Sequence, residues 1–116
     1  MRGAALLLAA LLPVAACAAD AGWTVAGQQG LVRTVIVPAA QAADREAYVR
    51  EIARLCEPEK TCFLNFHTNS TGAALDMPLP DAIAHEATAV FRRSAKNGSE
   101  RFQWSCRMKV APNDCF

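Results

Sequence analysis

The pattern of apolar and polar residues divides the first half of the folded part of the chain into a strand and a helix. Residues 31–37 are rich in β-branched side chains and end in an apolar run before a proline, which predicts a strand covered on both faces. Residues 44–56 place apolar side chains three or four positions apart, which predicts an amphipathic helix. Asp44 is suited to cap the start of this helix, and Pro58 prevents its continuation.

The second half of the pattern predicts a strand, a helix and a further strand. Residues 61–67 form a strand whose alternate side chains share a face. Residues 80–96 repeat apolar side chains at helical spacing, from a proline at the first turn to a stop at Asn97-Gly98. Residues 100–108 alternate between apolar and polar, so this strand turns one face to the core and the other to water. The core-facing residues of the last strand are expected to be Phe102, Trp104, Cys106 and Met108.

The predicted order β-α-β-α-β corresponds to an α+β, or small α/β, fold in a single domain. Short connections and right-handed crossovers favour a three-stranded sheet with two helices on one face. The domain covers residues 31–116, and residues 20–30 form a Gly-rich tether with a short strand at 23–26. An alternative makes residues 89–94 a strand that pairs, through the following Asn-Gly turn, with residues 100–106.

The N-terminus has the layout of a secretory signal peptide, which we assign to residues 1–19. One positive charge at Arg2 is followed by an unbroken apolar run at residues 4–12, then by Pro13 and a stretch of small residues. The run is shorter than the roughly 18–20 residues that a membrane-spanning helix needs. These features predict export of the chain.

Two cleavage sites fit the end of this signal. The segment Val14-Ala15-Ala16-Cys17 resembles the lipobox of bacterial lipoprotein precursors, which implies cleavage before Cys17 and a lipid anchor on its thiol. In such lipoproteins a small neutral residue after the cysteine, here Ala18, goes with the periplasmic side of the outer membrane. The alternative is ordinary cleavage after the small-x-small segment 16–18, which would leave the protein free in the periplasm or secreted.

The cysteine count supports both sites and predicts disulfides. Of five cysteines, four remain once Cys17 is lipidated or removed, and an exported protein folds in an oxidising compartment. The closest spacings favour the pairs Cys56–Cys62 and Cys106–Cys115, with the other two connectivities open. The spacings are not the tight pairs of structural zinc sites, and no metal or other cofactor is expected.

The charge of the chain excludes one class of partner, and few residues are candidates for catalysis. The chain has 12 Lys and Arg against 11 Asp and Glu, and loss of Arg2 with the signal leaves no net charge, so a strongly basic nucleic-acid binder is excluded. The polar loop 68–79 follows His67 at the end of a strand, where α/β proteins often bind ligands. A Ser-His-acid set could be drawn from His67, Ser70 and Asp76, although the nucleophile elbow G-x-S-x-G is lacking.

Two functional hypotheses follow from these features. The first is a non-catalytic binding, inhibitory or assembly module of the bacterial envelope, whose partner is an unknown envelope protein or an anionic polymer. Its surface would be the wet face of the last predicted strand around Arg101 and Arg107, together with His67 and Asn69. The alternative is a small periplasmic hydrolase or metal-dependent enzyme that uses His67 and the loop 68–79.

Overall fold

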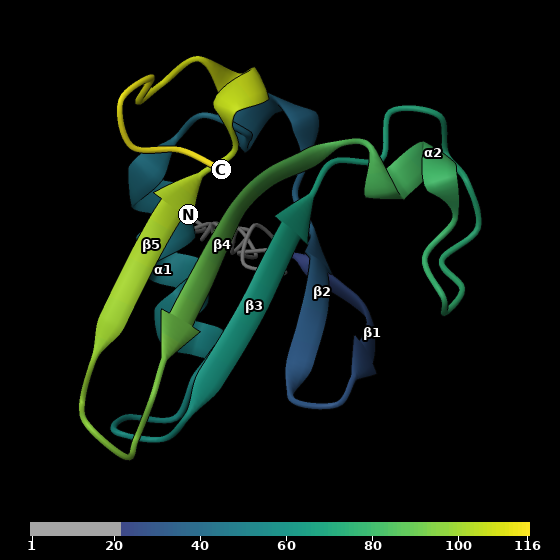
Figure 1. Cartoon of the computed structure of the whole chain (residues 1–116). Helices are drawn as coiled ribbons and strands as arrows, with labels where there is room; N and C mark the ends of the chain where they lie inside the picture. Colours follow the sequence, from purple (N-terminus) through teal and green to yellow (C-terminus); the bar gives the residue numbers. More distant parts are fainter. Residues whose placement is uncertain (1–21) are drawn as a thin grey trace, which may run out of the picture.

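Five strands form one mixed sheet, and helix α1 packs across one of its faces (Figure 1). The computed structural model describes residues 22–116, so the predicted signal segment and Cys17 lie outside the described residues. The strands are β1 (Thr24–Gln29), β2 (Val32–Ile36), β3 (Cys62–His67), β4 (Ala87–Arg93) and β5 (Glu100–Trp104). The helices are α1 (Arg45–Leu55) and the four-residue α2 (Asp81–Ala84), and 3-10 turns lie at Ala39–Gln41 and Cys106–Met108.

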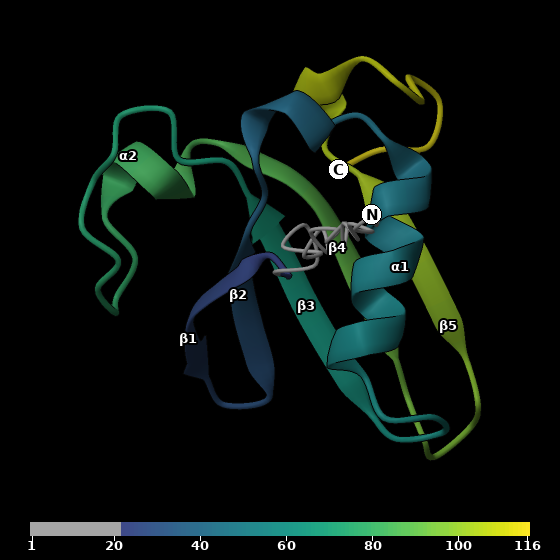
Figure 2. The same ribbon diagram turned by 180° about the vertical axis from the view of Figure 1, so that it is seen from behind.

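Sequential strands are neighbours throughout, in the order β1-β2-β3-β4-β5. β2 and β3 are parallel and are joined through α1, whereas the other neighbouring pairs are antiparallel. Figure 2 shows α1 lying over the sheet, with the β1–β2 hairpin to one side of it. None of the helices within residues 22–116 has the length and apolar character needed to span a bilayer.

Tyr48 of α1 lies at the centre of the core between the helix and the sheet. Its side chain is fully buried, and its ring meets those of Phe66, Phe102 and Trp104 edge to face, with centroids 5.0, 5.4 and 5.1 Å away. Its hydroxyl donates to the Ala42 carbonyl at 2.6 Å, so this buried polar group is satisfied. Burial raises the pKa of Tyr48 to about 12. Phe102 and Trp104 thus face the core, as their alternation in the sequence predicted.

The expected three-stranded sheet with two helices on one face is wrong, because residues 87–93 form strand β4 instead of a helix. The alternative pairing is confirmed: β4 and β5 are antiparallel, with Phe91 opposite Phe102. The apolar positions of this segment fit either periodicity, and burial in the sheet decides between them. As a strand, Ala89 and Phe91 are buried and the backbone pairs with both β3 and β5. Only residues 81–84 keep a helical turn.

The last strand is also shorter than predicted. β5 ends at Trp104, and Cys106–Met108 form a 3-10 turn that sends the chain back toward the sheet. The C-terminal tail then lies parallel beside the end of β5, where the Phe116 amide donates to the Trp104 carbonyl at 3.1 Å. The disulfides Cys56–Cys62 and Cys106–Cys115 are both present, and the second ties down this tail.

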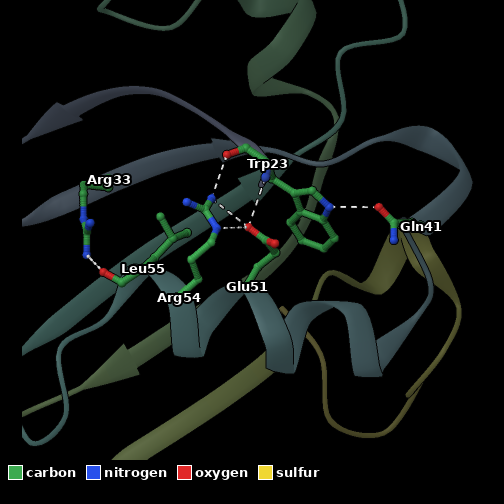
Figure 3. Close-up of polar contacts among 6 residues, drawn as sticks. All are labelled: Trp23, Arg33, Gln41, Glu51, Arg54 and Leu55. Carbon is green, nitrogen blue, oxygen red and sulfur yellow. Dashed lines mark hydrogen bonds and ion pairs between the residues drawn. The ribbon is translucent and has the colours of Figure 1, made fainter. Parts of the chain in front are cut away.

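Trp23, at the start of the described residues, is hydrogen-bonded to α1. The strand expected at 23–26 is present as the longer β1, an edge strand paired with β2. Figure 3 shows Trp23 held by three hydrogen bonds: its backbone amide donates to Glu51, its indole donates to Gln41, and its carbonyl accepts from Arg54. In the same view Arg33 of β2 donates to the Leu55 carbonyl, at the end of α1 where a positive charge is favourable.

Candidate functional site

Side chains point away from α1 on one face of the sheet, which we call the helix-free face. On β3, β4 and β5 it consists of Phe63, Asn65, Val90, Arg92, Arg101 and Gln103, which follows from the strand register. At the β1 end, Met77 of the long loop packs over Gly27, where an added Cβ would lie 2.6 Å from the Met77 side chain. The charged residues in this set, Arg92 and Arg101, lie on β4 and β5.

Two arginines occupy directly opposite positions on this face. Arg92 of β4 pairs with Arg101 of β5 in the antiparallel ladder, so the two side chains leave the sheet side by side. Like charges at directly opposite positions destabilise a sheet. A shallow cavity of about 550 Å³ opens beside the pair. Its lining is Phe63, Arg92, Ser94, Ser99, Glu100 and Arg101.

Arg92 is half-buried, and no carboxylate within residues 22–116 forms an ion pair with it. Its guanidinium donates to Asn65 Oδ1 at 2.8 Å and to the Leu64 carbonyl at 3.1 Å, and its Cζ lies 5.5 Å from the centre of the Phe63 ring. Burial lowers the pKa of Arg92, but an arginine remains charged in proteins. A positive charge without an acidic partner is therefore held in place against the sheet.

Arg101 already forms an ion pair with a carboxylate in the C-terminal tail of the same chain. Asp114 accepts from Arg101 Nη2 at 3.2 Å and from Gln103 Nε2 at 3.4 Å. Both members of the ion pair are largely exposed, so water screens the interaction and little energy is needed to replace it. Glu100, the acid in the lining of the cavity, is engaged by Arg93 at 2.9 Å. The ion pair between Arg101 and Asp114 shows that a carboxylate can bind on this face.

Arg107 does not share a strand face with Arg101, because β5 ends before it. Its Nε donates to the Ala87 carbonyl at 2.7 Å and its Nη2 to Thr68 Oγ1 at 3.4 Å. These partners lie at the end of β3 and the start of β4, whereas Arg101 pairs near the other end of β4. The predicted grouping of Arg101 with Arg107 is therefore replaced by the pair Arg101 and Arg92.

The side chains of His67 and Asn69 form hydrogen bonds that stabilise the segment after β3. The His67 side chain is buried, and its Nδ1 lies 2.9 Å from the Ile83 carbonyl, so this nitrogen carries a proton. Burial lowers the pKa of His67. Asn69 closes a turn: its Nδ2 donates to the Ala73 carbonyl and its Oδ1 accepts from the Ala73 amide. Neither residue contributes to the helix-free face around the arginines.

A carboxylate in the turn that follows α2 binds the loop after β3, and it was not singled out from the sequence. Glu86 accepts from the Thr68 hydroxyl at 2.7 Å and from the amide and the hydroxyl of Ser70. These bonds lower the pKa of Glu86 to about 2. Ser70 is thus bound to Glu86, and no hydrogen bond within residues 22–116 joins it or Asp76 to His67. The same residues contain no group of three or more His, Cys, Asp or Glu placed to hold a metal ion.

We expect the stabilising effect of Glu86 to fade at low pH. Because the pKa of Glu86 is about 2 in the fold against an ordinary 4.5, its bonds stabilise the protein above pH 4.5 and are lost as the pH falls toward 2. The effect should be below about 1 kcal/mol, since the group is close to water. In thermal melts, Glu86→Gln should be less stable than wild type at neutral pH and equal to it near pH 2.

Glu57→Gln, which alters an exposed carboxylate outside the loop, is the matched control and should show no such convergence. A deficit of Glu86→Gln that is the same at both ends of the pH range would contradict the assignment of these bonds to the ionised form.

Comparison of the chain with protein-family models, curated proteins and solved structures finds no match in any of the three.

Proposed function

We propose that this protein is a non-catalytic binding module of the bacterial envelope that takes a carboxylate-bearing partner on its helix-free face. The observation that carries the proposal is the cross-strand pair Arg92 and Arg101, in which Arg92 has no acidic partner within residues 22–116. A carboxylate bound at this pair would offset the two positive charges on neighbouring strands and accept charge-assisted hydrogen bonds. Asp114 gives an intramolecular example of the same contact.

Location in the envelope is part of the proposal and rests on the signal-like segment 1–19 and the lipobox-like segment that ends at Cys17. The two disulfides are consistent with an oxidising compartment. Trp23 is fastened to α1 and lies six residues after Cys17. Six extended residues reach at most about 20 Å, so a lipid on Cys17 would keep the domain next to the membrane surface.

Poly-L-glutamate is a suitable probe of the binding face, with titration calorimetry as the measurement. We expect the wild-type domain to bind it and added salt to weaken the complex, because the charges are exposed. Arg101→Glu should weaken binding about tenfold or more, because it replaces an attraction by a repulsion. Its melting temperature should change little, since Arg101 is exposed and its ion pair contributes little to stability.

Arg50→Glu is the matched control, because Arg50 is an exposed arginine on α1 that receives the same change of charge. It should leave poly-L-glutamate binding nearly unchanged. A wild-type domain that does not bind the polymer, or an equal loss in both variants, would overturn the proposal.

A further inference from the structure

Part of the outer edge of β5 has free backbone hydrogen-bonding groups. The Ser105 amide donates to the Thr88 carbonyl, near the start of β4. In an antiparallel pair every second residue directs its backbone N–H and C=O groups to the partner strand, so every second residue back from Ser105 bonds to β4. The residues between them, Glu100 and Phe102, direct their backbone groups to the outer edge. The tail covers this edge only from Trp104 onward. Within residues 22–116 the outward backbone groups of Glu100 and Phe102 have no backbone partner outside the β4–β5 ladder.

The chain itself shows that this edge accepts an additional strand. The Phe116 amide donates to the Trp104 carbonyl at 3.1 Å, and the Cys106 amide donates to the Phe116 carbonyl at 2.8 Å, as in a parallel ladder. The tail therefore occupies the end of the edge and leaves the positions beside Glu100 and Phe102 for another extended segment.

A groove of about 380 Å³ lies between α1 and this edge, next to the free backbone groups. Figure 2 shows α1 running alongside β4 and β5 on that face of the sheet. Val49 is 50 % exposed at the groove, and the guanidinium of Arg45 lies 4.1 Å from the centre of the Phe102 ring. The lining consists of Arg45, Val49, Ile52, Ala53, Phe91, Arg93, Glu100 and Phe102.

We infer that the free edge of β5 takes an extended acidic segment of a partner protein as a sixth strand of the sheet. This rests on the proposed function, since it names the partner that would carry the carboxylate. In a strand pair, residues opposite each other share a face. A residue opposite Phe102 would point into the groove and should be apolar, whereas a residue opposite Arg101 would point to the helix-free face and should be acidic. Backbone hydrogen bonds would supply affinity and these two side chains specificity.

A second copy of the chain fits this edge poorly. If two β5 strands pair symmetrically about Arg101, the Arg101 side chains of the two copies lie opposite each other. If they pair about Glu100, the two Glu100 side chains lie opposite each other. Like charges in these positions are destabilising. A pair centred on Phe102 needs the outward groups of Trp104, which the tail occupies. The edge and its charges favour a different, acidic segment.

The test uses a labelled peptide of alternating valine and glutamate, with fluorescence anisotropy as the measurement. Two comparison peptides keep its charge: one has the same residues in two blocks, and the other carries N-methyl groups on alternate backbone amides. If the segment adds as a strand, both should bind at least about tenfold more weakly than the alternating peptide. On binding, the largest amide chemical-shift changes in the protein should fall at Glu100 and Phe102.

Val49→Glu should weaken binding of the alternating peptide by about tenfold, because it places a charge in the groove. Val25→Glu is the matched control, since Val25 is 40 % exposed on the opposite edge strand, and it should leave binding unchanged. If the three peptides bind equally and Arg101→Glu still loses poly-L-glutamate binding, strand addition is overturned and the proposed function stands. If neither poly-L-glutamate nor any peptide binds, both are overturned.

Discussion

Replacement of Tyr48 by alanine is expected to lower the free energy of unfolding by about 3–5 kcal/mol, as for other large aromatic residues removed from a core. The Tyr48 ring touches those of Trp23, Phe66, Phe102 and Trp104, so the cavity would open where α1 meets β3, β5 and the segment before β1. Because Tyr48 is fully buried, few neighbours can move to fill the space. Denaturant unfolding followed by fluorescence measures the loss.

Tyr48→Phe is the matched variant, because it keeps the ring and removes the hydroxyl that donates to Ala42 and lies 2.9 Å from Thr88 Oγ1. We expect it to cost about 1–3 kcal/mol, the usual range for a buried hydrogen bond whose partner is left unpaired. An alanine variant no less stable than the phenylalanine variant would show that this ring is not the centre of the core.

Loss of either disulfide should be the next largest effect. The cysteines are separated by 6 and 9 positions, and the chain-entropy model assigns roughly 2–3 kcal/mol to each such loop. The double variant Cys56→Ala with Cys62→Ala should be the more damaging, because both side chains are buried in the core. The double variant Cys106→Ala with Cys115→Ala releases an exposed tail and should lose little beyond the entropic effect.

Denaturant unfolding of the two double variants, with wild type in the presence and absence of a reductant, measures both contributions. Wild type in reductant should be the least stable sample, since it lacks both links. Unchanged stability in either double variant would contradict the stabilising role of that disulfide.

The sequence predicted those features in which local signals agree. The helix from residue 44 appears as α1 at Arg45–Leu55, with Asp44 accepting hydrogen bonds from the amides of Glu46 and Ala47 as an N-cap does. Both disulfide pairs were predicted from spacing, because cysteines close in sequence at a corner need little rearrangement to meet. Alternation in the last strand correctly assigned Phe102 and Trp104 to the core and Arg101 to the opposite face.

The candidate site was predicted only in part, because Arg92 was placed in a helix. In a helical segment 80–96 it has no cross-strand neighbour, so its pairing with Arg101 could not be seen. The β-branched and aromatic residues around Val90, followed by an Asn-Gly turn, were the available signal, and they supported the alternative hairpin. Arg107 was misplaced for a related reason, since the predicted strand ran past Trp104 into a 3-10 turn.

By itself, the sequence determined the positions of β2, α1 and β3, the cysteine pairs and the inward face of β5, because each depends on neighbours within a few residues. The tertiary structure decided what depends on distant partners. Residues 87–93 satisfy helical and strand periodicity alike, and the strand prevails because β3 and β5 on either side pair with its backbone and bury Ala89 and Phe91. The same pairing places Arg92 beside Arg101, and the returning tail decides how much of the β5 edge stays free.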